Sequence, residues 1–383
     1  MTTLRGRSCS RCIFDTIVSA IKFDEHGICN YCRLVERLER DYGTGTEEGQ
    51  RRFSEIAERI RREGKRKKYD CVVGVSGGTD SSYLLWLATQ YGLRPLAAHY
   101  DNTWNSAIAT ENIRKVTKQL NVDLYTHVVD NTEMDDIFKS FFLASVPELD
   151  GPTDIALAEV LYRAAAQHGI RYVFEGHSLQ GEGVAPLGDA YVDGAYIASV
   201  HRKFGTVPMR TFPNMPLLSF LKWISVKGIR KIRPLWYLPY SKEEARKQLA
   251  DEFGWQYYGG HHLENRMTAF HHSYYNPLKF GIDNRNNSLS ASVRSGMMTR
   301  EAALDEYSSS PHLEAGLLTY FKKRLDLTET EFDRIMNLPP KSYRDYRTYK
   351  RTFERMKPFF WLMTKMNLVP ESFYVKFTSR SEI

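Results

Sequence analysis

One segment in the first quarter of the chain constrains the fold more than any other. An apolar, β-branched run from Val72 to Val75 leads into a Ser-Gly-Gly turn at 76–78, and a helical pattern is established by Tyr83. This order predicts a buried strand, a tight turn and a helix start. Backbone N–H groups at such a junction, together with the positive end of the helix dipole, can hold a phosphate. We therefore expect the chemistry here, and an ordinary strand-to-helix turn is the alternative.

Strand-like and helix-like segments alternate after this turn. Further strands are predicted at 96–100, 123–129 and 172–175, with helices over 108–120 and 155–168. Such alternation is typical of an α/β fold with a doubly wound parallel sheet covered on both faces. Ligands bind at the carboxyl ends of the strands in these sheets. We expect residues 76–82, 99–102 and 176–178 to surround one crevice.

Four of the five cysteines form two closely spaced pairs. Cys9 and Cys12 make the first pair and Cys29 and Cys32 the second. The spacing is typical of a structural Zn²⁺ site with four thiolate ligands. Two disulfides, or redox use of one pair, are the alternatives, and a cytoplasmic environment disfavours disulfides. Cys71 lies in the strand before the turn and is expected to be a small core residue.

Composition and charge narrow the class of protein. The chain is 42% hydrophobic and 26% charged, and no apolar run approaches membrane-spanning length, so we expect a cytoplasmic protein without a membrane partner. Lys and Arg number 53 against 46 Asp and Glu, and much of the excess lies in 51–68. This stretch predicts a solvated helix and linker, or a surface for nucleic acid or another anionic partner.

The turn is not a Walker A motif, because no lysine follows it. It resembles the PP-loop, Ser-Gly-Gly-x-Asp-Ser, of the ATP pyrophosphatases, matched by Ser76, Gly77, Gly78, Asp80 and Ser81. The resemblance implies that ATP is cleaved between its α- and β-phosphates. AMP passes to a carbonyl-type oxygen and is then displaced by a nitrogen or sulfur nucleophile.

The residue types of the loop suit ATP and Mg²⁺. Glycines let the backbone approach the pyrophosphate, hydroxyls can donate hydrogen bonds to it, and the Asp80 carboxylate can help hold Mg²⁺. We expect ATP contacts from the whole loop, namely Ser76, Gly77, Gly78, Thr79, Asp80, Ser81 and Ser82. Asp80 and Ser81 are also expected to act in catalysis.

Other ATP-site residues follow from position in the family. The end of the second strand contacts adenosine in PP-loop enzymes, which implies His99 and Asp101, and a later glycine turn near the ATP implies Gly176 and His177. His177 is also a catalytic candidate, with a capping or core imidazole as the alternative. Two segments, 232–235 and 241–244, resemble those that follow the ATP domain in many PP-loop enzymes. The Gly- and Pro-rich stretch 181–216 is expected to be a lid or binding loop.

Residues 255–275 combine imidazoles, a carboxylate and an amide. If the segment is helical from His261, several polar side chains share one face. They are His261, Glu264 or Asn265, Thr268, and His271 or His272. An active-site wall for proton transfer, a further metal site, and a polar helix packed through Met267 and Phe270 are the three interpretations.

Three stretches, 259–268, 274–285 and 295–301, are similar to the bacterial N-acetyl sugar amidotransferases of surface-polysaccharide and LPS O-antigen biosynthesis. Those enzymes also carry the N-terminal cysteine pairs and the PP-loop. Their members vary at His262, His271 and His272, which favours Glu264 and Asn265 as catalytic residues. Together these patterns predict four regions: a zinc knuckle (1–40), a basic helical linker (41–68), the PP-loop ATP pyrophosphatase domain (69–258) and a mainly helical substrate or partner region (259–383).

The implied reaction adenylates the acetamido oxygen of a nucleotide-linked or acidic sugar. Ammonia then displaces AMP and leaves an acetamidino group. In the family, ammonia comes from a separate glutaminase through a channel-forming synthase-like subunit, and no glutaminase segment is recognisable in this chain.

A PP-loop enzyme that modifies tRNA is the main rival. Thiolation needs catalytic cysteines, and only Cys71 remains outside the zinc set, whereas lysidine-type nitrogen transfer stays open. Retention of Asp80 and the loop serines disfavours a non-catalytic nucleotide-binding regulator. Nucleic acid is therefore not the partner we expect.

Overall fold

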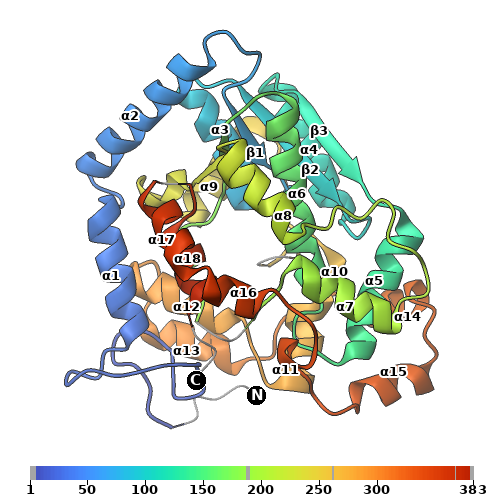
Figure 1. Cartoon of the computed structure of the whole chain (residues 1–383). Coiled ribbons are helices and arrows are strands. Elements are labelled where there is room, and N and C mark those ends of the chain that lie inside the picture. The colour runs from blue at the N-terminus through green and yellow to red at the C-terminus, as the bar shows by residue number, and fades with distance from the viewer. Residues whose placement is uncertain (1–5, 187–189, 261–262, 367, 380–383) are drawn as a thin grey trace.

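A five-stranded parallel sheet lies in the upper right part of the view in Figure 1, above the C-terminal helices. The computed structural model describes residues 6–186, 190–260, 263–366 and 368–379. The strand order is β3-β2-β1-β4-β5, which places β1 at the middle. The strands are β1 (Cys71–Gly74), β2 (Pro95–Asp101), β3 (Leu124–Val128), β4 (Tyr172–Phe174) and β5 (Arg230–Ile232). The predicted α/β fold with a parallel sheet is confirmed, and β5 is an additional strand.

Helices cover both faces of the sheet because successive residues of a strand point to opposite sides. Val73 belongs to a core shared with α2 (Glu47–Gly64), α3 (Thr79–Gln90), α4 (Ala107–Gln119) and α9 (Lys242–Phe253). Val72, the preceding residue, lies in the core on the other face. That core is formed with α6 (Gly151–Gln167), α8 (Leu217–Leu221), α16 (Lys350–Arg355) and α17 (Lys357–Lys365). The continuous apolar character of β1 thus reflects burial on both sides.

Two N-terminal helices precede the sheet in the chain. α1 (Asn30–Tyr42) and α2 are separated at Gly43 and Gly45, which both have positive φ, and run along one side of the molecule (Figure 1). On α2, Arg51 pairs with Glu48 at 2.8 Å and with Glu55 at 2.6 Å. These pairs favour the solvated-helix interpretation of this part of the basic stretch.

Several helices were not anticipated, among them α5 (Asn131–Ala144), which follows β3, and α7 (Gly194–Phe204), which lies inside the stretch expected to be a loop. Asp193 caps α7, and apolar residues at helical spacing, Tyr196, Ile197 and Val200, bury its inner face. The lid prediction for 181–216 is therefore wrong over α7, because the flanking glycines and prolines obscured a short amphipathic pattern.

The C-terminal region is helical, as expected. Its remaining elements are α10 (Arg266–Phe270), a π-helix (His271–Tyr275), α11 (Asn276–Phe280), α12 (Arg285–Arg294), α13 (Arg300–Ser308), α14 (Leu317–Arg324), α15 (Glu329–Met336) and α18 (Glu371–Thr378). Phe270 of α10 and Phe321 of α14 join a core with residues of α5 and α7. The exact boundaries of the four regions stay a prediction. Within the described ranges, no helix is long and apolar enough to cross a membrane.

Candidate functional site

The PP-loop lies at the carboxyl end of β1 and opens α3. Gly78 is the N-cap of α3 and provides no side-chain cap, so the first turn of the helix presents its N–H groups at a cavity wall. Gly77 has φ +81°, and a Cβ there would meet the Ala109 carbonyl oxygen of α4 at 2.2 Å. Gly77 therefore permits close packing of α4 and does not line the cavity, whereas Gly78 does.

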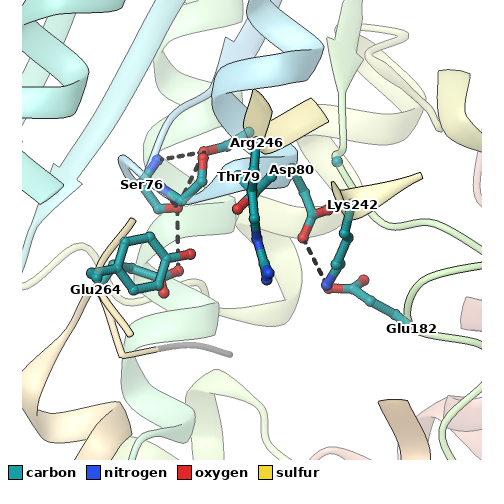
Figure 2. Close-up of a pocket in the computed structure, with 11 residues that line it drawn as sticks. Ser76, Thr79, Asp80, Glu182, Lys242, Arg246 and Glu264 are labelled. Atoms are coloured by element: carbon teal, nitrogen blue, oxygen red, sulfur yellow. Dashed lines mark hydrogen bonds and ion pairs between the residues drawn. The ribbon is translucent and has the colours of Figure 1, made fainter. Parts of the chain in front are cut away.

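A cavity of about 130 Å³ lies against the loop (Figure 2). Its wall consists of Ser76, Gly78, Thr79, Asp80, Ser81, Gly176, Glu182, Lys242, Arg246, Tyr258 and Glu264. Figure 2 shows Arg246 pointing into the space between the Ser76–Glu264 side and the Asp80–Lys242 side. Hydroxyls, two cations and a helix N-terminus around one small cavity suit a polyphosphate.

Asp80 is held in a charged network at this cavity. Its carboxylate accepts a hydrogen bond from the Tyr240 hydroxyl and lies 3.1 Å from the Lys242 ammonium, which is also 3.9 Å from Glu182. Burial alone would lower the pKa of Lys242, but the Asp80 and Glu182 carboxylates outweigh it and raise that pKa. Lys242 is thus a fixed positive charge beside the carboxylate predicted to hold Mg²⁺.

Glu264 lines the same cavity beside Ser76. One of its carboxylate oxygens lies 3.5 Å from the Ser76 hydroxyl, which is 3.2 Å from the Ser81 hydroxyl. The backbone around Glu264 pairs with the loop after β2, since Ser106 donates to the Glu264 carbonyl at 2.8 Å and Arg266 donates to the Trp104 carbonyl at 2.9 Å. These bonds fix a residue 188 positions away from Ser76 beside the PP-loop.

Asn265, the other catalytic candidate of this segment, has a different place. Its side-chain oxygen caps α10, and its amide donates to Asn102 at 2.8 Å and to Asn105 at 3.0 Å. It does not line the cavity. The amide anchors the Glu264 segment to the loop after β2, so we keep Glu264 alone as the catalytic candidate here.

His99 and Asp101, at the carboxyl end of β2, do not line the cavity either. His99 is buried, its Nδ1–H donates to the Val75 carbonyl at 2.8 Å, and burial lowers its pKa. Asp101 accepts hydrogen bonds from the Thr103 backbone at 2.8 Å and from Asn105 at 3.2 Å. Their predicted ATP contacts therefore stay predictions without a place in this cavity.

In the turn after β4, one of the two predicted site residues lines the cavity and the other does not. Gly176 lines the cavity, and a Cβ there would lie 3.5 Å from that of Asp80. His177 is outside the lining, accepts a hydrogen bond from the Trp236 indole at 3.0 Å, and has its pKa lowered by burial. This is the alternative that the sequence left open, a neutral structural imidazole. Ser82 is also outside the lining and is buried in α3.

The histidines of the 255–275 segment do not form an active-site wall in the described part of the chain. The predicted helix begins at Arg266, and His261 and His262 lie outside the described residues. His271 is buried, its Nε2–H donates to the Pro147 carbonyl at 2.6 Å, and burial lowers its pKa to about 4. His271 thus contributes to packing as a neutral side chain.

Four cavity residues were missed from the sequence as site residues: Glu182, Lys242, Arg246 and Tyr258. Lys242 lies in a segment that resembles other PP-loop enzymes, and Arg246 follows one helical turn later on α9. Residues 242 and 246 lie four positions apart and so share one face of the helix that follows the segment 232–235. This spacing is the signal that could have identified both cations.

The four paired cysteines form one buried cluster. Each is 0% exposed, and their sulfur atoms all lie within 4.8 Å of one another. Cys9–Cys32 and Cys12–Cys29 separations are both 3.9 Å, close to the edge of about 3.8 Å that a tetrahedron with Zn–S bonds of about 2.3 Å requires. The donor set therefore fits Zn²⁺, and these separations are too long for disulfides. Cys71 is a buried core residue, as predicted.

The cysteine cluster is docked on the C-terminal region. Ile13 donates to the Ser290 hydroxyl at 3.3 Å, and Arg300 donates to the Cys12 carbonyl at 3.1 Å and the Cys9 carbonyl at 3.2 Å. Arg294 lies over the Phe14 ring at 5.4 Å, buried, with no hydrogen-bond partner for its three guanidinium nitrogens among the described residues. A zinc tetrathiolate carries a net negative charge, which suits a buried cation beside it.

A parallel sheet with Ser-Gly-Gly-x-Asp-Ser at the carboxyl end of its central strand defines a PP-loop protein. Within this class, residues 264–359 match the family described as "LPS biosynthesis protein WbpG-like, C-terminal domain". This part of the chain is thus similar to the C-terminal domain of the WbpG-like LPS-biosynthesis proteins, which confirms the predicted resemblance to proteins of LPS biosynthesis. The matched region begins at Glu264, the residue that reaches the PP-loop.

Other similarities are more distant. An uncharacterized protein of Methanocaldococcus jannaschii is 28% identical over 173 residues, which cover 45% of this chain and 59% of that relative. The NMN synthetase from Francisella tularensis has 14% identity and a TM-score of 0.31, covering 76% of this chain and 97% of that chain. The NH₃-dependent NAD synthetase from Campylobacter jejuni has 13% identity and a TM-score of 0.32, covering 82% and 99%. We take the fold from the strand order itself.

Proposed function

We propose that the protein is an ATP-dependent, AMP-forming amidotransferase of LPS biosynthesis that converts the acetamido group of a sugar into an acetamidino group. The observation that carries the proposal is the shared cavity. The PP-loop and Glu264, the first residue of the region that matches the WbpG-like family, both line this cavity.

The PP-loop side of the cavity suits the phosphates of ATP. The N-terminal turn of α3 and the hydroxyls of Ser76 and Ser81 supply hydrogen-bond donors, and Lys242 and Arg246 supply positive charge. Asp80 would hold Mg²⁺, which neutralises charge on the pyrophosphate when bound. In this assignment the acetamido oxygen forms a bond to the α-phosphorus as the bond to pyrophosphate breaks.

The Glu264 side suits the second half of the reaction. Ammonia forms a bond to the imidate carbon, and AMP departs with the electrons of the carbon–oxygen bond. Glu264 would orient the ammonia and take up a proton from its nitrogen during attack, the role of a general base within reach of the reacting group. The position of the Glu264 carboxylate supports this role, because it borders the same cavity as Ser76 and Ser81.

We include the ammonia supply in the proposal. A separate glutaminase, coupled through a channel-forming synthase-like subunit, would deliver ammonia to this chain. The salt bridges of Arg51 and Arg52 with acidic residues of α2 give no support to a nucleic-acid surface on that helix.

The test is an incubation of the purified protein with ATP, Mg²⁺, ammonium chloride and a panel of acetamido sugars, both nucleotide-linked and acidic. We expect pyrophosphate and AMP in equal amounts, dependent on one sugar, and a product in which mass spectrometry finds NH in place of oxygen. Pyrophosphate release that is stimulated by tRNA and by no sugar would overturn the proposal in favour of tRNA modification.

A further inference from the structure

A second cavity, of about 340 Å³, adjoins the PP-loop cavity. It is lined by Tyr83, Gln180, Pro239, Tyr240, Ser241, Glu244, Ala245, Gln248 and Met297. These residues come from α3, the turn after β4, the start of α9 and the loop between α12 and α13. The volume falls in the range of about 300–1,000 Å³ that is usual for small-molecule sites.

The chemistry of this cavity differs from that of its neighbour. The PP-loop cavity has Lys242 and Arg246 in its wall, whereas the described lining of the second cavity contains no lysine or arginine and one carboxylate, Glu244. Such a lining disfavours phosphate. Its hydroxyls, amides and carboxylate instead suit a neutral ring with several hydroxyl groups, which donate to carboxylate and amide oxygens.

Two tyrosines give the cavity an aromatic side. The rings of Tyr83 and Tyr240 have centroids 5.4 Å apart, inclined at 47°. Aromatic faces of this kind pack against the C–H groups of a sugar ring while polar side chains bind its hydroxyls. The side-chain nitrogen of Gln248 donates to Glu252 at 2.9 Å. Its side-chain oxygen can accept a hydrogen bond from a ligand hydroxyl.

Tyr240 joins the two cavities. Its ring lines the second cavity, and its hydroxyl donates a hydrogen bond to the Asp80 carboxylate of the first. A molecule in the second cavity would therefore lie one side chain away from the proposed site of ATP cleavage. The WbpG-like domain contributes Met297 to this wall, and Ser295 of the same loop donates to the Gln180 carbonyl at 3.0 Å.

We propose that the second cavity binds the pyranose ring of the acetamido sugar. Tyr83 and Tyr240 would pack on the ring, Glu244 and Gln248 would accept hydrogen bonds from its hydroxyls, and Met297 would close the outer side. The choice of a sugar as ligand rests on the proposed function, while the cavity and its chemistry do not.

The test uses Met297→Trp, which fills the cavity from a side chain that is 42% exposed, with Met297→Leu as the matched control. Binding of UDP-N-acetylglucosamine and of free N-acetylglucosamine to the full chain is followed by saturation-transfer NMR, and ATP binding by calorimetry. We expect Met297→Trp to weaken binding of at least one of the two probes by roughly tenfold or more, with ATP affinity within about twofold. Met297→Leu should bind like the parent protein. Glu244→Gln, on the exposed surface of α9, should weaken sugar binding without disturbing the fold.

The outcomes separate this inference from the proposed reaction. Sugar binding that Met297→Trp abolishes supports the second cavity even if no pyrophosphate is released. Sugar-dependent pyrophosphate release with the same KM for sugar in Met297→Trp and the parent protein would leave the reaction standing and overturn the sugar site. Failure of both probes to bind the parent protein, or equal binding to the parent protein and Met297→Trp, would also overturn it.

Discussion

The cysteine cluster and the PP-loop cavity are built in opposite ways. All four sulfur ligands come from residues 9–32, and two sequence-local pairs bring them together. The cavity instead takes its wall from the loop at 76–81, the turn at 176–182, α9, Tyr258 and Glu264. The first depends on local spacing, and the second depends on how the sheet and the C-terminal region assemble. A change in the cluster should therefore act on stability, and a change in the cavity on activity.

The largest effect should follow from loss of a zinc ligand. We expect Cys29→Ser to lower bound zinc from near one per chain and to reduce the free energy of unfolding by several kcal/mol, since metal binding and folding are coupled. Metal analysis and thermal denaturation measure both. Cys71→Ala, which alters the buried cysteine outside the cluster, should keep its zinc. A Cys29→Ser protein with full zinc and an unchanged melting temperature would contradict the zinc assignment.

Asp80 gives the sharpest test of the cavity. Asp80→Ala should lower sugar-dependent pyrophosphate release by roughly a hundredfold or more, because it removes the carboxylate that would hold Mg²⁺ and frees the Lys242 ammonium from its partner. Zinc content should not change. Asp251→Ala, an exposed position on α9, is the control and should be active. Near-normal release by Asp80→Ala would reject the PP-loop assignment.

Substitutions of the adjacent residues Glu264 and Asn265 should have smaller effects, one on catalysis and the other on stability. Glu264→Gln should lower kcat by roughly tenfold to a hundredfold with little effect on stability, as expected when a general base is neutralised. Asn265→Ala should lower stability by about 1 kcal/mol through loss of the helix cap. Steady-state kinetics and urea denaturation separate the two. If the kinetic defect belonged to Asn265→Ala alone, the distinction between the two roles would be wrong.

The sequence predicted those cavity residues whose position depends on a local strand-to-turn pattern. Ser76, Asp80 and Gly176 were placed correctly at the cavity, since the carboxyl ends of β1 and β4 follow from strand order. The phosphate contact predicted for Gly77 stays a prediction, because Gly77 does not line the cavity and a Cβ there would meet the Ala109 carbonyl oxygen. A glycine motif alone does not distinguish a glycine required by a bound ligand from one required by a closely packed helix.

Contacts between residues far apart in the sequence explain the site residues that were assigned a different role or missed. Asn265 and His177 have the side chains expected of catalytic residues, yet their hydrogen bonds to Asn102 and Trp236 are structural, and those partners lie 163 and 59 positions away. Lys242 and Arg246 were missed for the same reason, because α9 reaches the PP-loop only after the chain has folded. A local sequence pattern does not predict which face of a distant helix will line a cavity.

The docking of the cysteine cluster has a consequence for the order in which this protein is made. The cluster is synthesised first, but its partner Ser290 lies 277 residues beyond Ile13. At about 5–20 residues per second, that distance takes a ribosome roughly 14–55 s. During this time Ile13 has no α12 to cover it. The nascent chain therefore carries a finished metal-binding module with an uncovered apolar side, and the last quarter of the protein ends that exposure.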